Sequence, residues 1–188
     1  MMAVGRLLEV GVAVSDLGAA SARLGHIIGA RASKVIVDRT FAMRFQMCRV
    51  GCADFELMQP DGSGTLIARF ISRRGEGLHH IAFEVSDAVA AMAHFRERGI
   101  PPLSAEPVLL ENLKAFFLPP RCLSGVLVEF IENLHTWVDG VPLPAPDSNP
   151  TAKAGLLAQT EVAGFGVLVQ DLGAAAASFA AILGATNS

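Results

Sequence analysis

The sequence has no apolar stretch that approaches the roughly 20 residues needed to cross a bilayer. It also has no excess of basic residues, since 15 lysines and arginines stand against 18 aspartates and glutamates, a formal charge of −3. Proteins that bind nucleic acid or anionic membrane surfaces through charge carry clustered basic residues. The composition therefore argues against a nucleic-acid partner and against a membrane partner.

Cysteine is scarce, and the N-terminus lacks the core of a signal peptide. Cys48, Cys52 and Cys122 are an odd number and contain no CxxC pair, which disfavours a disulfide framework and a zinc knuckle. Arg6 is followed by Glu9 inside the first apolar stretch, which interrupts a signal-peptide core. We therefore expect a mature, cytoplasmic protein with reduced thiols.

The sequence does contain an internal repeat. LEVGVAVSD (residues 8–16) aligns with HHIAFEVSD (79–87), and the longer stretch GVAVSDLGAASARLGHIIGARAS (11–33) aligns with GVLVQDLGAAAASFAAILGATNS (166–188). Each copy is typical of a strand that leads, through an aspartate N-cap, into an amphipathic helix. Because a repeat constrains the architecture more than local propensity does, the chain is predicted to contain related modules.

Hydrophobic periodicity predicts the other elements of the first two modules. Strands are predicted at residues 7–14, 33–37, 41–50, 53–59, 78–85, around 103, 113–118 and 125–131. Helices are predicted to follow Asp16 and Asp87, with a third at residues 65–74. The fold class is therefore predicted to be α+β, with paired βαβββ modules.

The domain boundaries follow from this pattern. Residues 1–132 are predicted to form one domain, with modules at about 7–60 and 77–132 joined by the linker helix at 65–74. Residues 133–160 are rich in proline and are predicted to be a linker. Residues 161–188 are predicted to start a further module, of which only a strand and a helix are present.

Four polar side chains occupy repeat-related positions in the predicted strands. Glu9 aligns with His80 on the first strand of each module, and Glu56 aligns with Glu129 on the last. Carboxylates are rare in the middle of apolar strands unless they have a partner. If both strand pairs face one cavity, a divalent cation would relieve the repulsion between the carboxylates.

Two neighbours of His80 are predicted to have other roles. His79 shares a face with Ile81 and Phe83, so it is expected to pack against apolar residues or to support a ligand from behind. Glu84 shares the face of His80, where it is expected to lie at the rim as a solvated charge.

Three motifs resemble one known family. GEGLHHIAFEV, FELMQP and SGVLVEFIE resemble the vicinal oxygen chelate superfamily, and within it they are most similar to methylmalonyl-CoA epimerases. The resemblance covers about residues 7–132. It implies a cup-shaped mixed sheet, the glyoxalase fold.

The resemblance also implies a set of ligands and roles. It implies one divalent metal ion (Mg, Mn, Co, Ni or Zn) held by Glu9, Glu56, His80 and Glu129. Glu129 is the base that the resemblance implies, and Glu56 is the candidate for the opposite face of the substrate. The implied partners are a small-molecule substrate, such as an acyl-CoA, and a second copy of the chain in a homodimer.

The sequence departs from the family pattern at two points. Glu9 stands where the family has His or Gln, and its extra charge favours harder cations such as Mg or Mn. Some epimerases have a further acid/base glutamate on the second or third strand, and no match is found between Val35 and Arg49.

Three functions are therefore compatible with the sequence. The leading hypothesis is a metal-dependent epimerase or isomerase that moves a proton α to a carbonyl, as in methylmalonyl-CoA. The second is a glyoxalase I-type lyase, which would act on a thiol adduct with the same metal and the same proton transfer. The third is a metal-free small-molecule-binding or resistance protein of the same superfamily, which the departure at Glu9 favours.

Overall fold

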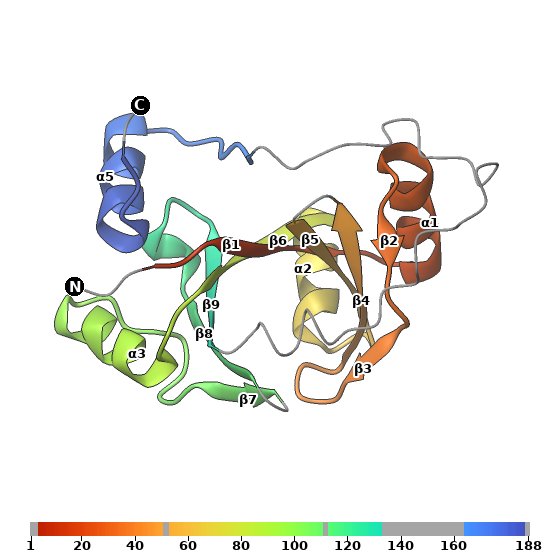
Figure 1. Cartoon of the computed structure of the whole chain (residues 1–188), viewed down its shortest axis with the longest axis horizontal. Helices are drawn as coiled ribbons and strands as arrows, with labels where there is room; N and C mark the ends of the chain where they lie inside the picture. Colours follow the sequence, from red (N-terminus) through yellow and green to blue (C-terminus); the bar gives the residue numbers. More distant parts are fainter. Residues whose placement is uncertain (1–3, 51–52, 111–112, 133–163, 187–188) are drawn as a thin grey trace. The chain divides into compact units, whose positions relative to one another are not determined.

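The computed structural model describes residues 4–50, 53–110, 113–132 and 164–186 (Figure 1). The chain divides into two compact units. Of the described residues, the N-terminal unit contains Glu9–His79, and the C-terminal unit contains residues 4–8, 80–132 and 164–186.

The N-terminal unit is a mixed sheet covered by a helix. Strand β1 (Leu7–Ala13) lies parallel to β5 (Ala53–Pro60), and β5 lies antiparallel to β4 (Met43–Val50). The short strands β2 (Arg31–Ala32) and β3 (Ile36–Asp38) both pair antiparallel with β4. Helix α2 (Leu66–Arg74) follows β5, as the sequence predicts for residues 65–74.

Helix α1 (Leu17–Ile28) begins and ends where the sequence predicts. The Asp16 side chain accepts a hydrogen bond from the backbone N–H of Ala19, and Gly29 ends the helix with φ of 70°, which glycine adopts without a steric penalty. Helix α1 packs on β4 and β5 (Figure 1). Its apolar face meets the two strands in a small cluster that includes Leu17, Cys48 and Leu57.

The C-terminal unit repeats this topology. Strand β6 (Gly77–Glu84) lies parallel to β9 (Leu127–Glu132), β9 lies antiparallel to β8 (Leu113–Leu118), and β8 lies antiparallel to β7 (Val108–Leu110). Helix α3 (Ala88–Glu97) follows β6, and a 3₁₀ turn, η1 (Pro120–Cys122), precedes β9. The predicted α+β fold of paired βαβββ modules is therefore confirmed.

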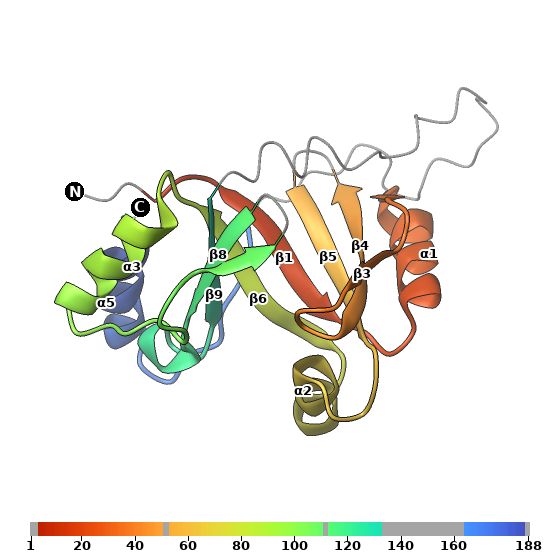
Figure 2. The same cartoon turned by 90° about the horizontal axis from the view of Figure 1, so that it is seen from below.

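The outer face of this sheet carries the larger apolar core. Phe116, Phe130 and Val128 are fully buried there against Met92 and Phe95 of α3. Helix α5 (Leu172–Leu183) packs against the same core (Figure 2). Its contacts come from Phe179, Ile182 and Leu183.

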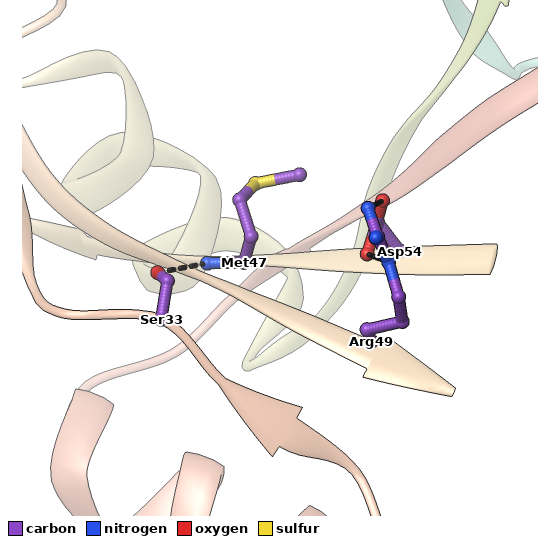
Figure 3. A network of polar contacts seen from close by, with 4 residues as sticks. All are labelled: Ser33, Met47, Arg49 and Asp54. Atoms are coloured by element: carbon purple, nitrogen blue, oxygen red, sulfur yellow. Dashed lines mark hydrogen bonds and ion pairs between the residues drawn. The ribbon is translucent and has the colours of Figure 1, made fainter. Parts of the chain in front are cut away.

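The strand predicted at residues 33–37 is interrupted, and Figure 3 shows the reason. The backbone N–H of Ser33 donates to the carbonyl of Met47, while the hydroxyl of Ser33 accepts from the N–H of Met47 at 3.1 Å. A side chain has therefore taken the place of a backbone acceptor, which breaks the ladder between β2 and β3.

The strand predicted around Leu103 is wrong, and the structure places β7 at Val108–Leu110 instead. Pro101 and Pro102 follow α3, and proline cannot donate to a sheet ladder. Leu103 itself is exposed and donates one backbone hydrogen bond, to the carbonyl of Phe117.

The third repeat contains its predicted helix but lacks its predicted strand. Its helix is present as α5, but residues 164–170, all of which the structure describes, form no strand. A strand is stable only when its backbone groups are paired, and Leu168 in this stretch is fully exposed. The predicted linker at 133–160 lies outside the described residues.

The cysteines that the structure describes are free thiols. Cys48 is buried and Cys122 is half-buried, whereas Cys52 lies outside the described residues. Burial, with a smaller contribution from the charge of Asp54, raises the pKa of the Cys48 thiol to about 11. The thiol is therefore protonated at neutral pH and serves as a small apolar side chain.

Among the described residues, no helix is long and apolar enough to cross a membrane.

Glu132, at the end of β9, fixes the start of α3. Its Oε2 accepts a hydrogen bond from the N–H of Ala88 at 2.8 Å, and its Oε1 lies 2.9 Å from Nζ of Lys114. The Ala88 N–H, followed by Lys114, lowers the pKa of the Glu132 carboxyl below its ordinary value of 4.5. A negative charge at a helix N-terminus is favourable because the helix dipole is positive there.

This contact predicts a stability loss in acid. Because the folded-state pKa is lowered, the contribution of Glu132 is present above the ordinary pKa and is lost as the pH falls through the folded pKa. We expect Glu132→Gln to reduce the free energy of unfolding by about 1 kcal/mol at neutral pH, because a neutral acceptor replaces a charged one. Urea unfolding from neutral pH down to about pH 3 measures this, and the difference from the parent should shrink in acid. A difference that is constant with pH would contradict the assignment.

Candidate metal site and proton-transfer residues

The N-terminal unit brings Glu9 and Glu56 together. The two residues come from the parallel strands β1 and β5, where Glu9 pairs with Asp54 and Gly11 pairs with Glu56. Residues that pair across neighbouring strands point to the same face, so both glutamates lie on the face opposite α1. Their exposed fractions are 4% and 8%. A carboxylate oxygen of Glu9 and one of Glu56 lie within 4.8 Å of each other.

The C-terminal unit brings His80 and Glu129 together. His80 comes from β6 and Glu129 from the neighbouring β9. The imidazole Nε2 lies 3.1 Å from Oε2 of Glu129, and both side chains are buried. The ring of Phe117 packs edge-on against His80, with ring centroids 6.1 Å apart. The surrounding surface is apolar and includes Ala82 and Ile131.

The residues present fit a divalent cation. Two ligand atoms at right angles on an octahedral ion, each about 2.1 Å from it, are separated by about 3 Å, which is close to the distance between His80 and Glu129. Three carboxylates and one imidazole are donors suited to Mg, Mn and the harder transition metals. Within its own unit, each pair therefore offers two buried donors of a kind that a divalent cation binds.

His79 and Glu84 lie where the sequence predicts. His79 packs edge-on against Phe70 of α2, with ring centroids 4.8 Å apart. Glu84 is partly exposed, and its Oε2 lies 3.8 Å from Nε of Arg6. Glu84 is thus a partly exposed, ion-paired charge at the end of strand β6.

Strand β4, which the structure describes in full, offers no second acid/base glutamate. Its face toward Glu56 carries Met43, Phe45, Met47 and Arg49, since these residues pair with the inward residues of β5. No carboxylate is present among them.

Sequence reasoning missed one ion pair beside the two glutamates. Arg49 donates from Nε and Nη2 to the two carboxylate oxygens of Asp54 at 2.9 and 2.8 Å (Figure 3). Asp54 has an exposed fraction of 3%. The only signal in the sequence was that Asp54 lies two residues before Glu56 on the same strand face.

Comparisons with known proteins agree with the fold. The family model of the Glyoxalase/Bleomycin resistance protein/Dioxygenase superfamily matches residues 9–117. The mitochondrial methylmalonyl-CoA epimerase of Mus musculus is 34% identical over 128 residues, which cover 67% of this chain and 72% of the mouse protein. The ethylmalonyl-CoA/methylmalonyl-CoA epimerase of Cereibacter sphaeroides is 34% identical over 129 residues, which cover 67% of this chain and 96% of that protein.

A solved structure gives the same result. The methylmalonyl-CoA epimerase of Streptomyces coelicolor, a variant in complex with 2-nitronate-propionyl-CoA, superposes with a TM-score of 0.66 and 26% identity. The match covers 69% of this chain and 95% of that one. The sequence motifs, the two βαβββ modules and these relatives agree, and the chain belongs to the glyoxalase/bleomycin resistance protein/dioxygenase superfamily.

Proposed function

We propose that the protein is a metal-dependent epimerase that moves the proton α to the thioester carbonyl of an acyl-CoA such as methylmalonyl-CoA. The observation that carries the proposal is the buried contact between His80 and Glu129, 3.1 Å apart. The repeat-related Glu9 and Glu56 form a second buried pair. Relatives of this chain at 34% identity are epimerases of this substrate class.

Glu9, Glu56, His80 and Glu129 are the residues proposed to hold one divalent cation. When bound, the ion supplies positive charge that polarises the substrate carbonyl and favours loss of the neighbouring proton. The glutamate at position 9 supports Mg or Mn as the ion, because a carboxylate suits a hard cation better than a neutral amide does.

Glu129 and Glu56 are proposed to move the proton. Epimerisation requires removal of the α-proton on one face of the carbon and its return on the other. Glu129 takes the proton as a carboxylate. Glu56, which belongs to the other module and starts the reaction as the protonated acid, delivers its own proton to the opposite face, so that one proton leaves the carbon and one is returned. Both carboxylates are buried, which keeps water from competing for the proton.

Two measurements test this proposal. The first is metal content by elemental analysis after purification without a chelator, for the parent and for the double variant His80→Ala, Glu129→Ala. We expect about one divalent ion per chain in the parent and none in the variant. The second is exchange of the α-proton of methylmalonyl-CoA with deuterium from solvent, which should occur in the parent loaded with Mg or Mn.

A matched control separates the site from general damage to the fold. The double variant His94→Ala, Glu97→Ala removes the same residue types from helix α3, which packs on the face of its sheet opposite His80 and Glu129. It should retain metal and exchange activity. A parent that takes up no Mg, Mn, Co, Ni or Zn would overturn the metal site. A metal-loaded parent that does not exchange the proton would overturn the epimerase assignment.

A further inference from the structure

Arg49, Asp54 and Glu9 form one row across three neighbouring strands. Arg49 of β4 pairs with Asp54 of β5, and Asp54 pairs with Glu9 of β1. Paired residues on neighbouring strands project to the same face of the sheet. Strands are spaced by about 4.8 Å, so the backbone of Asp54 lies between the backbones of Arg49 and Glu9. All three belong to the N-terminal unit.

Stability alone does not account for this ion pair, in which the Asp54 carboxylate is buried and the Arg49 side chain is 24% exposed. Replacing a buried ion pair with apolar residues is often neutral or stabilising, because removing two charges from water costs more than their attraction returns. The neighbouring positions on this face of β4 are already apolar, namely Met43, Phe45 and Met47. An apolar pair at positions 49 and 54 would continue that surface. The charges stand instead directly beside Glu9.

We infer that Asp54 and Arg49 are a positioning pair for the proposed cation, in which Asp54 neutralises Arg49 and prevents it from competing with the cation for Glu9. This inference rests on the proposed metal site. It explains how Glu9 can bind a cation although its negative charge also attracts any nearby guanidinium. The two carboxylate oxygens of Asp54 accept hydrogen bonds from Nε and Nη2 of that guanidinium, a bidentate contact that holds it in place.

Removing Asp54 and removing Arg49 should change cation binding in opposite directions, whereas a purely structural ion pair would give the same effect for both. If Asp54 loses its charge, the long and flexible Arg49 side chain places an uncancelled positive charge next to Glu9 and Glu56. That charge repels a dication and binds its ligands. If Arg49 is removed instead, the local charge becomes more negative, which favours a dication. Removing both should return the site to its original charge.

The experiment is a double-mutant cycle read by Mn²⁺ binding. The parent, Asp54→Asn, Arg49→Met and the double variant are each titrated with Mn²⁺ and followed by electron paramagnetic resonance of the free ion. We expect Asp54→Asn to weaken Mn²⁺ binding about 10- to 100-fold, the range typical of residues that do not bind the metal but orient the residues that do. Arg49→Met should bind Mn²⁺ at least as tightly as the parent. The double variant should bind within about three-fold of the parent.

Two controls keep the result interpretable. Arg44→Met removes an arginine from the same strand that is 45% exposed and 4.0 Å from Asp61, and it should leave Mn²⁺ binding unchanged. Circular dichroism and thermal unfolding establish that each variant is folded. If Arg49→Met does not fold, Arg49→Gln, which also removes the charge, replaces it in the cycle with the same expected results. Lysine keeps the charge but loses the bidentate contact, so Arg49→Lys should weaken Mn²⁺ binding.

Failure of this inference is distinct from failure of the proposed function. A parent that binds Mn²⁺, with Asp54→Asn binding equally well, would overturn the positioning role and leave the metal site intact. Equal weakening in both single variants without recovery in the double variant would show that the pair acts only on folding. A parent that binds no Mn²⁺ would overturn the metal site and the inference together.

Discussion

Replacing Glu129 with glutamine is expected to slow α-proton exchange by about 10²- to 10⁴-fold, the range for loss of a general base. Glutamine has the same length as glutamate and still offers an oxygen, but it cannot accept the proton. The side chain lies 3.1 Å from His80 and is buried, so water has little access with which to replace the lost base. Deuterium exchange at saturating substrate measures the effect.

A matched variant makes this result specific. Glu132→Gln changes the same residue type three positions along β9, on the opposite face, where it contacts Ala88 and Lys114. It should retain the exchange rate of the parent when assayed well below its unfolding temperature. Metal content should also be retained in Glu129→Gln, because an amide oxygen can replace a carboxylate oxygen as a ligand. A Glu129→Gln protein that exchanges within about ten-fold of the parent would show that another group is the base.

The features that the sequence predicted well are those that depend on one strand or one helix. Alternation placed His80 on one face of its strand, and the structure pairs it with Glu129. The aspartate caps at Asp16 and Asp87 mark the helix starts, since each accepts a hydrogen bond from a backbone N–H three residues later. Local sequence determines both features, so a single chain is enough to predict them.

The features that were missed depend on how strands meet. The ion pair between Arg49 and Asp54 exists because β4 and β5 pair in one register, and a slip of one residue would move Arg49 to the other face. The break at Ser33 depends on a hydroxyl that competes with the backbone for the N–H of Met47. Neither contact leaves a pattern within its own segment, so periodicity does not reveal them.

The third repeat also shows that sequence alone does not predict whether a strand finds a neighbour to pair with. Its sequence matches the first repeat closely, yet residues 164–170 form no strand while α5 is helical. Helical hydrogen bonds close within the segment, whereas those of a strand need a neighbour. In the first repeat β5 provides that neighbour for β1. Similarity of sequence therefore transfers the helix to the third repeat but does not transfer the strand.

The largest stability effect is expected from Phe130→Ala. Phe130 follows Glu129 on β9 and is fully buried on the outer face of the sheet. Its ring stacks on Phe116 with centroids 5.1 Å apart and lies 5.2 Å from that of Phe95. Truncating a fully buried phenylalanine leaves a cavity and costs about 3–5 kcal/mol. Urea unfolding followed by circular dichroism should show a loss of this size in the C-terminal unit.

A control substitution of an exposed phenylalanine tests whether the loss of stability comes from this core and not from replacing any phenylalanine. Phe165 is 36% exposed and lies in the segment before α5. Phe165→Ala should change the free energy of unfolding by no more than about 0.5 kcal/mol, as is usual for surface substitutions. Similar losses for both variants would mean that the stacked cluster of Phe95, Phe116 and Phe130 does not hold the sheet against α3. A loss confined to Phe130→Ala ties the stability of β9, and so the position of Glu129, to the aromatic core directly behind it.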